Sequence, residues 1–149
     1  MRLWRLAGAR HAGGAMTGEG AAMYGGRWNP VGTPAVYTSQ SLALATLELV
    51  VHLPGALARY VAIELDAPDE ALAPVEPGRL GPKWADDERR TQAVGLAWAG
   101  EGTLGLIVPT ALVDERAGEH NVVLNPRSPD FSRLTEVQRF DVVLDARLG

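Results

Sequence analysis

The sequence predicts an α+β domain with a mixed or antiparallel sheet and a few helices. Stretches typical of strands outnumber helical patterns along the chain. Irregular connections rich in proline and glycine join them, whereas a doubly wound fold would need regular crossover helices. With 149 residues, the chain has the length of one domain and can bury about two-thirds of its unfolded surface without disulfides or metal. We therefore expect a single domain over residues 1–149.

The predicted strands are short and apolar or alternating. The first places Trp4 and Arg5 on opposite faces, and a later one, YVAIEL, alternates as a half-buried strand does. Pro109 ends one strand, and Asn125 with Pro126 ends another. The predicted strands are Leu3–Leu6, Ala35–Tyr37, Tyr60–Leu65, Leu104–Val108, Val122–Leu124 and Phe140–Leu144.

Two helices are predicted. The segment Ser41–His52 carries apolar residues on nearly every helical face, which is typical of a helix buried on most sides; Ser39 or Ser41 would cap it, and the sequence HLPG at residues 52–55 would stop it. The segment Asp86–Ala99 has acidic residues in its first turn, and Gly100 fits as its terminator.

Two connections are predicted to be irregular. The run from residue 7 to Gly26 is rich in glycine and alanine and is expected to form a long loop with a helical turn at most; loops of this length often carry function. The segment Asp66–Lys83 is full of proline and glycine and is expected to wander over the surface.

Composition excludes several classes of protein. Cysteine is absent, which removes disulfides, thiolate nucleophiles and thiolate metal sites, and the three histidines lie far apart at positions 11, 52 and 120, so we expect no metal site. The net charge of −4 and the scattered basic residues argue against direct nucleic-acid binding. No secretory signal or membrane span is apparent, so the expected location is cytoplasmic. Walker, GxGxxG and GxSxG motifs are missing.

The stretch from Gly25 to His52 is the candidate functional centre. Glu48 falls in the middle of the apolar helix, where an ionised carboxylate costs several kcal/mol unless it finds a partner or a wet cleft. It could instead lie on a narrow polar stripe of the helix, and both interpretations stay open. A strand that leads into this helix would put Tyr37 beside the same cleft, and Arg27 could reach it from the loop that follows a pair of glycines.

Simpler interpretations exist for the other candidates. Arg5 reads most simply as a surface arginine on an edge strand, and Tyr37 as a core tyrosine whose hydroxyl is tied down. Thr110 reads as a turn residue after a proline, and Trp28 as core packing. From composition and spacing alone, the sequence indicates an enzyme-like cleft with Arg, Tyr and Glu.

The motifs read together are more specific. The chain resembles the RES-domain family, the toxins of bacterial RES–Xre toxin–antitoxin systems, over essentially its whole length. The matching elements, in order, are Leu3-Trp4-Arg5, GGRWNPVG at residues 25–32, VYTS at 36–39, Leu47-Glu48, Trp84, Thr91-Gln92, Trp98, Val108-Pro109-Thr110, NVVLNP at 121–126, Pro129-Asp130-Phe131 and the C-terminal stretch from Phe140 to Leu148.

The resemblance implies a fold similar to ADP-ribosyltransferase toxins and an enzyme that consumes NAD by cleaving its nicotinamide–ribose bond, by hydrolysis or phosphorolysis. It implies that Glu48, Arg27 and Tyr37 are catalytic and that Arg5, Arg27, Tyr37 and Thr110 bind substrate. Thr110 stands where the family has serine. No metal and no cofactor beyond NAD as substrate is implied.

These implied roles agree with the chemistry of the residue types. A fixed carboxylate, Glu48, stabilises an oxocarbenium-like ribose. The rigid donor forks of Arg27 and Arg5 suit a pyrophosphate, and Tyr37 can stack on the nicotinamide ring.

Two other functions stay open: an ADP-ribosyltransferase that modifies a protein, and a catalytically inactive binding module with the same fold. The implied partner is an Xre-type helix-turn-helix antitoxin, because the segment contains no evident inhibitory part of its own and restraint is expected from another chain. The sequence leaves open whether the chain also forms a homodimer.

Overall fold

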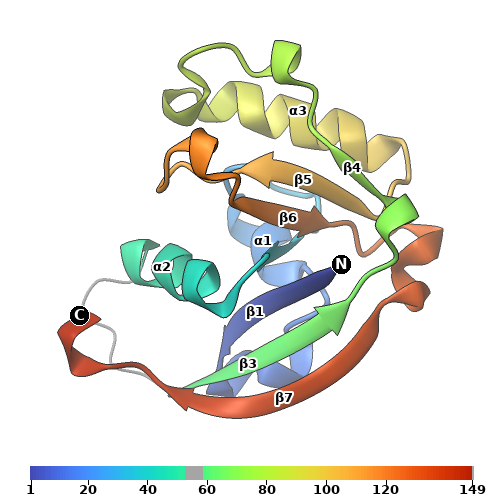
Figure 1. Cartoon of the computed structure of the whole chain (residues 1–149). Helices are drawn as coiled ribbons and strands as arrows, with labels where there is room; N and C mark the ends of the chain where they lie inside the picture. Colours follow the sequence, from blue (N-terminus) through green and yellow to red (C-terminus); the bar gives the residue numbers. More distant parts are fainter. Residues whose placement is uncertain (53–58, 149) are drawn as a thin grey trace.

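The computed structural model describes residues 1–52 and 59–148. It is built on a seven-stranded sheet with the order β4-β5-β6-β2-β1-β3-β7 (Figure 1). Among the described strands, β4 and β5 run parallel and the other neighbouring pairs are antiparallel. The predicted α+β class with a mixed sheet is confirmed. The strands are β1 (Arg2–Gly8), β2 (Val36–Ser39), β3 (Arg59–Asp66), β4 (Leu72–Pro74), β5 (Gly105–Pro109), β6 (His120–Leu124) and β7 (Thr135–Val143).

The sheet divides between β1 and β2. Strand β1 pairs with β3 along its whole length, but it meets β2 at the single pair Trp4 and Ser39. Beyond that pair the two strands separate, so β1-β3-β7 forms one half of the sheet and β4-β5-β6-β2 the other (Figure 1). A division of this kind leaves backbone groups of two central strands without their ladder partners, and side chains must satisfy them.

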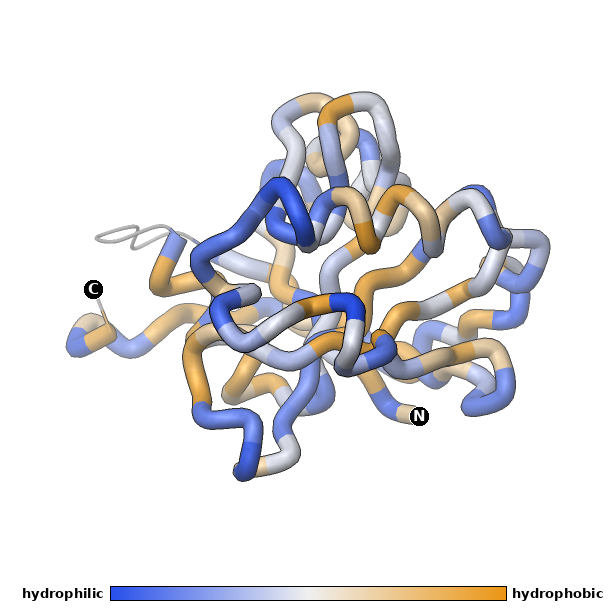
Figure 2. Tube along the Cα trace, turned by 90° about the horizontal axis from the view of Figure 1, so that it is seen from above, coloured by the Kyte–Doolittle hydropathy of each residue, from blue (hydrophilic) through white to orange (hydrophobic). Residues whose placement is uncertain are grey.

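Two hydrophobic clusters form the core, and the first of them joins the halves. One contains Leu3, Val36, Ile63 and Leu124 and lies on the face that carries the segment before residue 17. The other is rich in tryptophan. Viewed from above, hydrophobic stretches run through the middle of the molecule and hydrophilic stretches follow the outer loops (Figure 2).

The helix α2 (Leu42–His52) begins as predicted. The Ser41 hydroxyl accepts a hydrogen bond from the backbone N–H of Leu44 at 3.1 Å, so Ser41 is the capping residue. The prediction that this helix is buried on most sides is wrong. It packs one side against β1 and β2, and Leu47 and Val51 on its outer side are 42% and 50% exposed. The predicted stop signal after His52 lies outside the described residues.

The helix α3 (Glu88–Gly100) confirms the second predicted helix to within two residues at either end. Asp87 caps it by accepting a hydrogen bond from the backbone N–H of Arg90. Trp98 on α3 packs with Trp28, Trp84 and β5 in the tryptophan-rich cluster. A Cβ at Gly95 would lie 1.6 Å from the carbonyl oxygen of Trp28. Glycine at this position therefore lets α3 touch the backbone of the Gly25–Trp28 loop.

Three segments are more regular than predicted. The long loop before Gly26 contains a 3-10 turn (Ala9–Gly14) and the short helix α1 (Glu19–Tyr24). Strand β4 lies within the connection that was expected to be irregular. It has only three residues, which pair with β5. Strand β7 starts well before Phe140; it is an exposed edge strand with polar residues on both faces, so it lacks the apolar pattern of a buried strand. No helix in the described ranges is long and apolar enough to cross a bilayer.

Candidate active site

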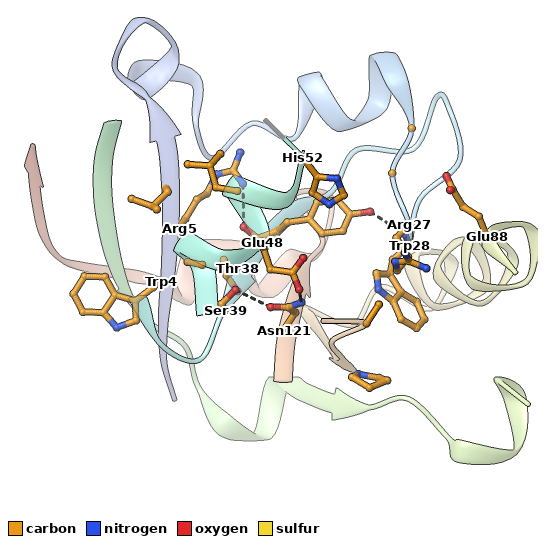
Figure 3. A pocket seen from close by; sticks show the side chains of 18 residues that line it. Trp4, Arg5, Arg27, Trp28, Thr38, Ser39, Glu48, His52, Glu88 and Asn121 are labelled. Atoms are coloured by element: carbon orange, nitrogen blue, oxygen red, sulfur yellow. Dashed lines mark hydrogen bonds between the residues drawn. The ribbon is translucent and has the colours of Figure 1, made fainter. Parts of the chain in front are cut away.

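A pocket of about 530 Å³ opens where the two halves of the sheet separate (Figure 3). Its walls come from β1, β2, α2, the Gly25–Trp28 loop and the ends of β5 and β6. Three of the four residues predicted to bind substrate and all of the predicted catalytic residues line it: Arg5, Arg27, Tyr37 and Glu48. The structure therefore brings together side chains from four separate segments of the chain.

Glu48 projects from α2 into this pocket (Figure 3). Its Oε1 accepts two hydrogen bonds, from Thr110 Oγ1 at 2.7 Å and from Asn121 Nδ2 at 2.6 Å. Within the part of the chain that the structure describes, Oε2 accepts none. Of the two open interpretations, the structure favours the carboxylate that faces a cleft. Two donors on one oxygen fix the side chain and leave the other oxygen for a ligand.

Asn121 and Ser39 complete this arrangement, although no role in the site was predicted for either. Ser39 on β2 pairs with Asn121 on β6 in the ladder, and its hydroxyl donates to Asn121 Oδ1 at 2.7 Å. Both residues line the pocket. Which strands pair, and in which register, is a tertiary property, so the spacing of these residues along the chain carries no signal for the contact.

The loop that carries Arg27 is tied to α3. Gln92 Nε2 donates to the Gly26 carbonyl at 2.8 Å, and the Thr91 hydroxyl donates to the Arg27 carbonyl. Gly26 itself is closely surrounded, because a Cβ there would lie 2.7 Å from Tyr37 Oη. The loop backbone therefore lies between α3 on one side and Tyr37 on the other, and the Arg27 side chain extends from it into the pocket.

The Arg27 guanidinium makes two contacts that orient it. Its Nη1 donates to the Ala85 carbonyl at 2.8 Å, and its Cζ lies 5.9 Å from the centre of the Trp84 ring, within the range of a cation–π interaction. Trp28 next to it is 3% exposed and packs in the core, as predicted. Arg27 keeps further N–H groups that can serve an anion in the pocket.

Arg5 lies between the two halves of the sheet. Strand β1 is central, so the interpretation of Arg5 as a surface arginine on an edge strand is wrong. Its Nε donates to the Ala15 carbonyl at 2.8 Å and its Nη1 to the Tyr37 carbonyl at 2.9 Å. Burial lowers the pKa of Arg5. The side chain thus satisfies a β2 carbonyl at the point where β1 and β2 separate, and it lines the pocket from there.

Tyr37 forms a wall of the pocket, and its hydroxyl is already engaged. Oη donates to Asn29 Oδ1 at 2.6 Å and accepts from the backbone N–H of Trp28 at 3.0 Å. Burial raises the pKa of Tyr37 to about 12. The hydroxyl is tied down, as the simpler interpretation expects, but Tyr37 is only partly buried and lines the pocket. The ring, not the phenol proton, is therefore the group available to a ligand.

Thr110 contacts Glu48 but does not line the pocket. Only 4% of its surface is exposed. Besides donating to Glu48, its Oγ1 accepts from the backbone N–H of Leu112 at 3.1 Å, which agrees with the predicted turn. Its predicted contact with substrate stays a prediction. Within residues 1–52 and 59–148, no cluster of three or more His, Cys, Asp or Glu is placed to hold a metal ion.

Comparison with known proteins finds a family that matches nearly the whole chain. The model of a family described as "RES domain" matches residues 2–145. A curated relative from Photorhabdus laumondii, "Toxin Res", is 34% identical and spans 99% of this chain and 97% of its own length. A second, from Sphingobium sp., "Prs ADP-ribosylating toxin", is 40% identical over 85% of this chain and 83% of its own.

A solved structure is also similar. It is a chain of the crystal structure of the M. tuberculosis MbcT-MbcA toxin-antitoxin complex, which superposes with a TM-score of 0.77 at 27% sequence identity. The match covers 95% of this chain and 84% of the other.

Proposed function

The chain belongs to the RES domain family, and on this basis we propose that it is the toxin of a toxin–antitoxin pair and cleaves the nicotinamide–ribose bond of NAD. The observation that carries the proposal is the Glu48 carboxylate, fixed through Oε1 by Thr110 and Asn121 in a pocket that it shares with Arg27 and the Tyr37 ring. A fixed negative charge beside aromatic and cationic groups suits a substrate that develops positive charge between a flat ring and a pyrophosphate.

In the proposed reaction, the bond between ribose C1′ and the nicotinamide nitrogen breaks. Its electron pair passes to the positively charged pyridinium, which leaves as neutral nicotinamide, while the ribose becomes oxocarbenium-like. Glu48 would stabilise this charge electrostatically. An oxygen nucleophile then bonds to C1′, and the proton that it carried passes to solvent. Because Glu48 Oε1 is occupied by two donors, Oε2 is the oxygen expected to face the ribose.

The remaining side chains would bind and orient the substrate. Arg27 uses Nη1 for the Ala85 carbonyl and keeps its other N–H groups for the pyrophosphate. Arg5 uses two donors for backbone carbonyls, so its part in binding the pyrophosphate is expected to be smaller. Tyr37 offers its ring to nicotinamide as a stacking surface. With a pKa of about 12 its phenol stays neutral at physiological pH, so no proton transfer is assigned to it.

A second candidate differs in the acceptor. The Sphingobium relative is named for ADP-ribosylation of Prs, which favours transfer of ADP-ribose to a protein as the alternative to release into water or phosphate. All three reactions break the same bond and use Glu48 in the same way. Incubation of the purified protein with NAD alone, with phosphate, and with candidate acceptor proteins separates them by product: ADP-ribose, ADP-ribose 1-phosphate, or a modified protein. If nicotinamide is released under none of these conditions, the chain is an inactive binding module instead.

The expected partner is an antitoxin of the Xre type encoded beside the gene. The similar M. tuberculosis structure is of a toxin-antitoxin complex, and in the present chain a partner could block the pocket by offering a carboxylate to Arg27. Co-expression with the neighbouring gene should restore growth of cells that produce this protein. The isolated complex should bind NAD poorly; if it binds NAD as well as the free protein does, inhibition acts away from the pocket.

A further inference from the structure

We infer that Asn121, itself held by Ser39, is a positioning residue that sets the orientation of the Glu48 carboxylate. The inference rests on the proposed function, since it assigns how the carboxylate used in that reaction is placed. It adds two residues to those expected from the resemblance, and it follows from a chain of hydrogen bonds that joins β2, β6 and α2 (Figure 3).

The polarity of the Asn121 amide is set by Glu48, because an ionised carboxylate only accepts hydrogen bonds. The Ser39 hydroxyl donates to Asn121 Oδ1 at 2.7 Å, and Asn121 Nδ2 donates to Glu48 Oε1 at 2.6 Å. If the amide turned over, its oxygen would face the carboxylate and repel it. Ser39 is only 3% exposed, so water cannot readily take the place of its hydroxyl. The serine therefore holds the oxygen end of the amide in place while the nitrogen end donates to Glu48.

Glu48 requires such a contact because of the helix that carries it. Helix α2 buries only Leu44 and Ala45 among its described side chains, so its packing alone does not define where a long, flexible glutamate points. Asn121 and Thr110 reach the same oxygen from the ends of neighbouring strands β6 and β5. Placing both donors on Oε1 leaves Oε2 directed at the pocket. An error of about 1 Å in a catalytic group can cost 10²-fold in rate.

The test is a set of variants assayed for nicotinamide release from NAD. We expect Asn121→Ala to lower kcat about 30-fold while KM changes less than about threefold, because the variant disturbs the reacting carboxylate more than substrate binding. Asn121→Asp keeps the shape and the bond from Ser39 but places a like charge beside Glu48, so its kcat should fall further. Ser39→Ala should lower kcat about fivefold, and in the Asn121→Ala background it should have no further effect, since it acts through the amide.

Asn125 provides a matched control on the same stretch of chain. It is 2% exposed and its Nδ2 donates to the Ala99 carbonyl at 3.2 Å, away from the pocket. Asn125→Ala should lower the melting temperature while kcat per folded protein stays the same. Independent, additive effects of the Ser39 and Asn121 substitutions, or a change in KM alone, would overturn the inference. An inactive wild-type protein would instead overturn the proposed function, and the inference with it.

Discussion

Thr110 Oγ1 lies 2.7 Å from Glu48 Oε1 and donates a hydrogen bond to it, although the two residues are 62 positions apart in the chain. The threonine replaces the serine that the resemblance leads one to expect. The structure shows how this replacement is accommodated: the hydroxyl is kept on the carboxylate, and the residue is almost fully buried behind it. The extra methyl group therefore does not enter the lining of the pocket.

The activity of Thr110 variants should depend on whether the new side chain keeps a hydroxyl group. Thr110→Ser keeps the donor, and we expect NAD turnover within about threefold of the wild type or above it. Thr110→Val keeps the shape and removes the donor to a charged group, which is worth roughly 1.5–3 kcal/mol, so kcat should fall at least about tenfold. Steady-state kinetics of the three proteins provide the measurement. Equal activity in all three would remove Thr110 from the site.

Two glycines of α3 should respond in opposite ways to alanine. Gly95 lies against the Trp28 carbonyl, and a methyl group there would overlap it, so Gly95→Ala should cost roughly 3 kcal/mol of unfolding free energy or more. A Cβ at Gly100 would meet no described atom within 4 Å, and Gly100→Ala should be neutral or slightly stabilising. Urea unfolding of both variants checks this. Similar losses in both would mean that the contact between α3 and the loop is not tight.

The ionisation of Tyr37 should be visible in the pH dependence of stability. Its pKa is raised to about 12 in the folded protein, against about 10 in an unfolded chain. The stabilisation is therefore fully present below pH 10 and is lost as the pH rises from 10 towards 12. Between pH 9 and 11 the wild type should lose about 1 kcal/mol more unfolding free energy than Tyr37→Phe does. Parallel losses in both proteins would contradict the burial of this phenol.

Arg27 should resist replacement by lysine. A lysine cannot donate to the Ala85 carbonyl and also present a planar fork to a pyrophosphate, so Arg27→Lys should raise KM for NAD by about tenfold or more with a smaller change in kcat. The exposed Arg127, which does not line the pocket, provides the control. Arg127→Lys should leave both constants unchanged. If the two variants behaved alike, Arg27 would not bind the substrate.

The sequence indicated the fold class because apolar alternation and capping residues are local signals. The cap at Ser41, the acidic first turn of the helix predicted over Asp86–Ala99 and the strand Tyr60–Leu65 were recognisable from their neighbours. The extent to which α2 is buried was not recognisable. An apolar helix face has the same sequence pattern whether it is buried or exposed, and the face with Leu47 and Val51 is exposed. The part of β7 before Phe140 was missed for the opposite reason, since this exposed edge segment carries polar residues on both faces and has no apolar pattern.

The candidate site was predictable only in part. Glu48 stood out as a carboxylate in apolar surroundings, with Arg27 and Tyr37 as candidates beside it. The resemblance assigned roles to these residues and to Arg5 and Thr110. The division of the sheet that makes room for the pocket depends on where β1 stops pairing with β2, at Trp4 and Ser39. That register, and with it the contact from Ser39 through Asn121 to Glu48, is set by long-range pairing and has no local signature.

The central claim, that Glu48 carries the cleavage of NAD, is tested most directly by the isosteric Glu48→Gln variant. The substitution removes the charge and keeps the shape, so nicotinamide release should fall by about 10³-fold or more while the melting temperature stays within about 2 °C of the wild type. Near-normal turnover by a folded Glu48→Gln protein would contradict this role and return Glu48 to the solvated residues of the helix.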